Sequence, residues 1–162
     1  MSSYSAFAWH DFFVAAVGAS AALLGLLFVT ISINLEHILK YPHLPGRAAS
    51  TLGTLLTVLV ICCFGLAPDQ SSKAFGWEIV AMSSLAATQI VWVSRHRDPA
   101  NPLRWTIGSL PILLVPVSVL LGGGVSLLVG GGGGIYWLLF GTALVFIGAS
   151  INAWVLLVEI LR

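Results

Sequence analysis

Residues 12–35 read FFVAAVGASAALLGLLFVTISINL and contain no Asp, Glu, Lys or Arg. A helix needs roughly 20 apolar residues to cross a hydrocarbon core about 30 Å thick, so this stretch is long enough to span a membrane. It exceeds the apolar core of a signal peptide, which has about 7–15 residues, and no Lys or Arg precedes it. We therefore expect a transmembrane helix over residues 11–39, rather than a signal peptide.

The rest of the 162-residue chain has the same character. Its residues are 58% hydrophobic and 8% charged, whereas about 25% of residues are charged in soluble domains. The mean hydropathy is +1.00. The sequence therefore predicts an all-α fold, a single domain over residues 1–162 built as a bundle of five transmembrane helices. After the first, the predicted spans cover residues 47–67, 74–94, 105–129 and 135–161.

Positive charge predicts how this bundle is oriented. Cytoplasmic loops of membrane proteins collect Lys and Arg. A five-span zigzag places Lys73 on one side and six cations on the other, namely Lys40, Arg47, Arg95, Arg97, Arg104 and Arg162. This split predicts an N-terminus outside and a C-terminus inside, and the six tryptophans fall three near each predicted interface. In an alternative with four spans, the glycine-rich residues 122–134 make the fourth segment re-entrant and return the C-terminus to the outside.

Polar side chains gather toward the predicted cytoplasmic ends of three spans. They are Thr30, Asn34 and Glu36 in the first span, Gln89 in the third and Asn152 in the fifth. Polar groups inside a membrane are costly, and they mark either a pathway or a contact between helices. One interpretation is a polar vestibule for an ion or small solute, open to the cytoplasm. The other is that these groups only join helices.

Small residues and prolines suggest two further features. Gly18, Ala22 and Gly25 lie in the first span at spacings that let helix backbones approach closely, so we expect a packing or self-association face there. Pro111 and Pro116 each remove an N–H donor from the fourth span and free a carbonyl four residues earlier. We expect them to kink this helix and to shape any polar site.

The chemistry of an enzyme is missing from the sequence. No nucleophile–base motif, paired intramembrane aspartate, two-cysteine metal knuckle or Rossmann fingerprint occurs. We therefore expect no catalytic activity, no cofactor and no metal site. The alternative of a zinc site requires His37, His43 and His96 to meet on the inner face. The net charge of +1 and the lack of a basic stripe give no indication of nucleic-acid binding.

One part of the chain resembles a known group of proteins. Residues 18–65, about a third of the sequence, include GLLFVTISINL at 25–35 and LPGRA at 44–48. This stretch resembles small bacterial inner-membrane proteins of unassigned function. The resemblance implies a multi-pass protein of the bacterial plasma membrane and implies no activity.

Two functional hypotheses follow. The first is a homo-oligomeric membrane protein with a channel-like or transport-like role for an ion or small polar solute. The second is a non-catalytic accessory or scaffold subunit, which binds another membrane protein through its small-residue helix faces. Both take the lipid bilayer as the surroundings of the protein.

Overall fold

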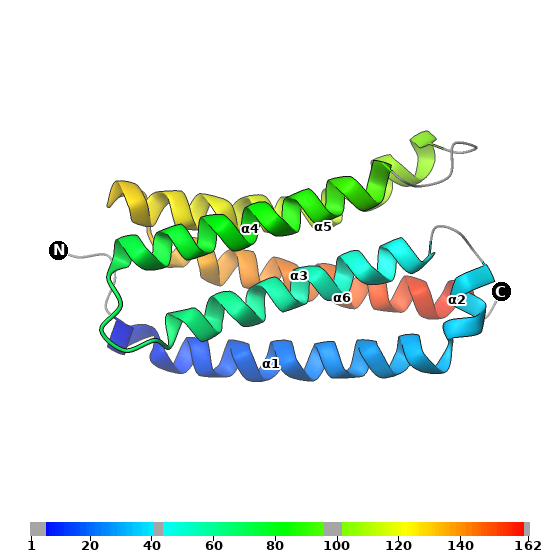
Figure 1. Ribbon diagram of the computed structural model, residues 1–162, viewed down its shortest axis with the longest axis horizontal. Coiled ribbons are helices and arrows are strands. Elements are labelled where there is room, and N and C mark those ends of the chain that lie inside the picture. Colours follow the sequence, from blue (N-terminus) through cyan, green and yellow to red (C-terminus); the bar gives the residue numbers. More distant parts are fainter. Residues whose placement is uncertain (1–5, 41–43, 96–101, 161–162) are drawn as a thin grey trace.

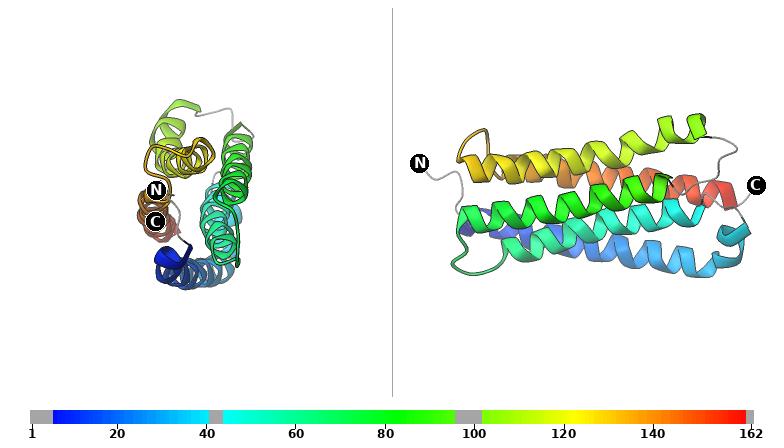
Figure 2. Two further views of the ribbon diagram at one scale, coloured as in Figure 1. Left: turned by 90° about the vertical axis from the view of Figure 1, so that its left-hand side faces the viewer. Right: turned by 45° about the horizontal axis from the view of Figure 1, so that its top comes forward.

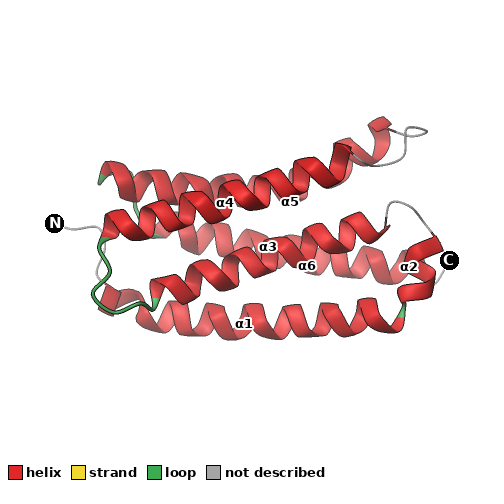
Figure 3. Ribbon diagram, viewed as in Figure 1, coloured by secondary structure: helices red, strands yellow, loops and turns green. Residues whose placement is uncertain are grey.

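The computed structural model describes the backbone of residues 6–40, 44–95 and 102–160, and within these ranges the side chains of residues 8–40, 44–95 and 110–154. Every element in the described residues is a helix (Figure 3). In chain order the helices are α1 (Ala6–Ile33), α2 (Leu35–Lys40), α3 (Leu44–Gly65), α4 (Ser72–Arg95), α5 (Pro102–Val129) and α6 (Tyr136–Ile160).

The five longer helices are long and apolar enough to cross a membrane, which confirms the prediction of an all-α protein with five candidate spans. They lie side by side, and α1 begins at the opposite end of the bundle from the end of α6 (Figure 1). Helix α5 continues through the glycines at 122–124 to Val129, the residue at which the predicted fourth span also ends. Helices α5 and α6 both run the length of the bundle, which argues against the four-span alternative (Figure 2).

The first span differs from its prediction as a single helix over residues 11–39. It is divided at Asn34 into α1 and the short α2. The side-chain Nδ2 of Asn34 donates a hydrogen bond to the backbone carbonyl of Thr30 at 2.9 Å, and the backbone N–H of Asn34 reaches the same oxygen at 3.3 Å. An Asn side chain that competes for a helix carbonyl weakens the regular pattern, which explains a break here.

Helix α3 is the central element. It contacts α1, α4 and α6 extensively, whereas α1 and α6 touch each other only slightly. Over its most apolar 18-residue window, 56% of the residues of α3 are buried, compared with 22% for α1. Seen from the end, α1 lies at the edge of the bundle (Figure 2). Most of the surface of α1 therefore faces outward.

The distribution of polarity fits a lipid environment. The exposed surface carries large apolar side chains such as Leu26, Ile33 and Phe140. The interior holds hydroxyl and amide side chains such as Ser20, Thr51 and Asn152. Apolar patches this extensive are rare on the surface of soluble proteins. We therefore describe the chain as a multi-pass membrane protein.

The two ends of the bundle differ in chemistry. At one end lie α2, the start of α3 and the end of α4, with Lys40, Arg47 and Arg95; we call it the basic end. The opposite end, which we call the glycine end, carries the turn between α5 and α6. Gly130 and Gly133 have φ angles of 74° and 99° there, a region that side chains with a Cβ rarely adopt. The glycine run thus forms a tight turn.

Candidate functional site

A buried polar cluster joins α3 to α6 at the basic end. The guanidinium group of Arg47 donates two hydrogen bonds to Oδ1 of Asn152, from Nε at 3.0 Å and from Nη2 at 2.7 Å. Nδ2 of Asn152 donates to Oγ1 of Thr51 at 3.2 Å. Oγ1 of Thr51 in turn donates to the backbone carbonyl of Arg47 at 2.9 Å. We call these three residues the Arg47 cluster.

The geometry of the cluster follows from the chemistry of its members. A guanidinium group only donates, so Asn152 presents its oxygen to Arg47 and its NH₂ group to Thr51. Thr51 lies one helical turn after Arg47 and can therefore accept from Asn152 while it bonds the carbonyl of Arg47. Arg47 is 5% exposed and Asn152 is fully buried. A buried charge needs hydrogen-bonding partners, and each such bond contributes about 1.5–3 kcal/mol.

Sequence reasoning placed Asn152 at a polar site but missed two members of this cluster. It treated Arg47 only as a topology signal at the start of a span. The sequence did contain a signal, because the hydroxyl residues Ser50, Thr51 and Thr54 follow Arg47. All three are buried in the structure. Such a run marks a helix face that is polar and turned inward.

The other pathway candidates, those of the first span, form no hydrogen bond with the Arg47 cluster. Oγ1 of Thr30 donates to the carbonyl of Leu26 at 2.8 Å, and Asn34 bonds Thr30 as described above. Glu36 is exposed in the first turn of α2. Thr30 and Asn34 thus bind carbonyls of their own helix.

Gln89 forms a different contact, between α4 and α3. Its Nε2 donates to the backbone carbonyl of Ala49 at 3.2 Å. The side chain lies against Gly53, where a Cβ atom would approach the Gln89 amide to between 2.2 and 2.8 Å. Gln89 therefore joins two helices, and a Cβ atom at residue 53 would require its amide group to move. Among the described residues, no hydrogen bond joins Asn34, Glu36, Gln89 and Asn152 to one another.

The two prolines of α5 occupy different surroundings. Pro111 is exposed, whereas Pro116 is buried in a small cleft between α3, α5 and α6. Pro116 frees the carbonyl of Ile112, as expected from the sequence. This oxygen lies 3.2 Å from the position that a Cβ atom of Gly148 would occupy. The backbone of α6 therefore packs closely against the freed carbonyl.

The small residues of α1 face away from the bundle. No atom lies within 4 Å of the position that a Cβ atom would take at Gly18 or Gly25, and Ala22 is exposed between them. Glycines inside the bundle behave differently, because a Cβ atom on Gly65 would meet the ring of Phe13 at 2.7 Å. We call Gly18, Ala22 and Gly25 the small-residue face of α1.

Two of the histidines in the zinc alternative, His43 and His96, lie outside the described residues. His37 is exposed on α2. Among the residues that the structure describes, no three His, Cys, Asp or Glu side chains are grouped so that they could hold a metal ion.

No protein-family model, curated protein or solved structure matches the chain. The function must therefore be inferred from the surfaces and contacts of the bundle itself.

Proposed function

We propose that this chain is a homo-oligomeric, non-catalytic protein of the bacterial plasma membrane, which works by lateral association of α1 with α1 of a second copy. The observation that supports the proposal most strongly is the outward small-residue face of α1. Helices in lipid associate by close packing, and small residues allow their backbones to approach. This face takes no part in packing within the bundle.

The same side of α1 continues as a large apolar surface toward the basic end. Leu26, Val29 and Ile33 are 67%, 54% and 77% exposed, respectively. At 100° per residue they lie on roughly the same side of the helix as Gly18 and Ala22. A partner helix along this side would thus contact the small-residue face first and then the large side chains of Leu26, Val29 and Ile33.

Bulky substitution tests this association. Gly18→Leu and Gly25→Leu place a side chain in open space, so they should leave the bundle folded and lower the oligomer fraction. Gly122→Leu on α5 is a matched control, because a Cβ atom there also meets nothing within 4 Å. The measurement is light scattering of purified protein in a mild detergent. The proposal fails if both α1 variants keep the oligomeric state of the unsubstituted protein.

Cross-linking in native membranes distinguishes whether α1 contacts a second copy of this chain or a different protein. In a variant with Cys62→Ala and Cys63→Ala, Ala22→Cys should form a disulfide-linked dimer upon oxidation. Ala143→Cys is the control, since Ala143 is exposed on α6 instead. A heterologous adduct at Ala22→Cys, without the homodimer, would favour the accessory-subunit hypothesis.

A channel-like or transport-like role remains a second candidate, supported by the Arg47 cluster. A buried guanidinium group near one end of a membrane bundle is the kind of group that marks a solute pathway. Proteoliposomes should then carry flux of an ion or small polar solute, and Asn34→Leu or Asn152→Leu should reduce it. Absence of flux across a broad panel, with folded protein, would count against this role.

A further inference from the structure

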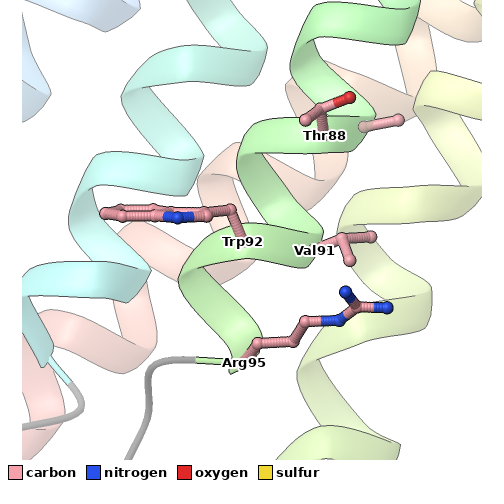
Figure 4. A pocket seen from close by; sticks show the side chains of 5 residues that line it. Thr88, Val91, Trp92 and Arg95 are labelled. Atoms are coloured by element: carbon pink, nitrogen blue, oxygen red, sulfur yellow. The ribbon is translucent and has the colours of Figure 1, made fainter.

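A shallow groove of about 340 Å³ runs along the outer side of α4 near the basic end. Its described lining consists of Ala87, Thr88, Val91, Trp92 and Arg95, which cover the last turns of the helix. In Figure 4 the side chains of Val91 and Arg95 extend toward α5, and the ring of Trp92 extends toward the α3 side.

The groove changes from apolar to cationic along the helix. Ala87 and Val91 provide hydrocarbon walls, and Oγ1 of Thr88 is bonded to the carbonyl of Ser84 on its own helix at 2.8 Å. Trp92 is 61% exposed, one turn before the end of α4. Indole rings at such positions favour the level of the lipid headgroups. The apolar part of the groove therefore lies at the depth of acyl chains.

Arg95 is the last residue of α4 and is exposed. No hydrogen bond or ion pair joins its guanidinium group to another described residue. The sequence that follows also carries Arg97 and Arg104 against a single acid, Asp98. A cation at the end of the helix, with an apolar groove beneath it, matches the order of an anionic headgroup and an acyl chain in a phospholipid.

We propose that this groove binds an anionic phospholipid, with its phosphate on the guanidinium group of Arg95 and an acyl chain along Ala87 and Val91. Basic groups at the end of a membrane bundle attract anionic lipids electrostatically, and a neutral lipid lacks this attraction. The site lies on α4, away from the small-residue face of α1. It does not depend on the proposed oligomer.

Native mass spectrometry of the purified protein tests the site, with phosphatidylglycerol and phosphatidylcholine of identical acyl chains as probes. The protein should retain phosphatidylglycerol preferentially. Arg95→Gln should weaken its binding about fivefold, as expected for the loss of one cation near an anionic lipid, while Arg95→Lys should keep most of it. Lys73→Gln, which removes an exposed cation at the glycine end, is the matched control. Equal retention of the two lipids, or equal binding by Arg95→Gln, overturns the proposal.

Two further measurements identify what occupies the groove. Thr88→Trp fills the groove from an exposed position and should displace phosphatidylglycerol without unfolding the helices, as checked by circular dichroism. Unchanged lipid binding in this variant would contradict the placement of the acyl chain. Inorganic phosphate should compete poorly with the lipid. Full displacement by phosphate alone would identify a simple anion site and overturn the lipid assignment.

Discussion

At the scale of single residues, the polar side chains of this protein divide into two kinds. Thr30 and Asn34 bind backbone carbonyls of their own helix, which satisfies them locally. Arg47 and Asn152 instead depend on each other across 105 positions of the sequence. A side chain that is satisfied within its own helix can be replaced at little cost in stability. Replacement of one member of a cross-helix pair instead takes a hydrogen-bond partner from the other member, which is buried.

We predict that Asn152→Leu lowers the free energy of unfolding by about 3 kcal/mol, because it removes the oxygen that accepts two hydrogen bonds from a buried guanidinium group. The double variant Arg47→Met with Asn152→Leu should recover part of this loss, since the buried charge is removed together with its Asn152 acceptor. Ser150→Ala is the control, because its hydroxyl is exposed and bonds only the carbonyl of Phe146. Reversible unfolding in detergent measures all three. A double variant less stable than Asn152→Leu alone would contradict the interpretation.

At the scale of helices, glycine has two opposite uses. Where α4 and α5 cross, a Cβ atom on Gly124 would lie 3.0 Å from the carbonyl oxygen of Gly76, and one on Gly76 would lie 3.1 Å from that of Gly124. The two backbones are therefore in direct contact. Gly122 is on the same helix, two residues earlier, and has open space around it. The surroundings, rather than the residue type, determine what each glycine does.

These surroundings predict stability changes of opposite sign for one substitution. Gly124→Ala should destabilise the bundle by about 1–3 kcal/mol, since it forces apart two packed backbones. Gly122→Ala should stabilise it by up to about 1 kcal/mol, because alanine is the better helix former and meets no obstacle. Thermal unfolding in detergent gives both values. Equal shifts in the two variants would show that the α4–α5 crossing is looser than described.

At the scale of the whole molecule, five apolar helices separate the basic end of the bundle from the glycine end at its opposite end (Figure 1). The excess of Lys and Arg supports our proposal that the basic end faces the cytoplasm, with the N-terminus outside and the C-terminus inside. The structure adds positions at which this orientation can be tested, because Gly131 in the turn between α5 and α6 has open space around it.

Labelling of single cysteines in intact cells tests this orientation. In the variant with Cys62→Ala and Cys63→Ala, a membrane-impermeant maleimide should label Gly131→Cys from outside. Lys40→Cys, on the exposed surface of α2, should be labelled only after the cells are lysed. The reverse pattern would invert the proposed orientation. Labelling of both positions from one side would mean that an even number of spans separates them.

The sequence by itself determined the class and the spans of this protein. A run of apolar residues long enough to cross the hydrocarbon core identifies a membrane helix without knowledge of the rest of the fold. The five segments could therefore be located within a few residues of the observed helices. It did not show that Asn34 would divide the first span. Only the tertiary structure decided which polar groups meet. Arg47 and Asn152 are neighbours because α6 packs against α3, and no local pattern encodes that packing.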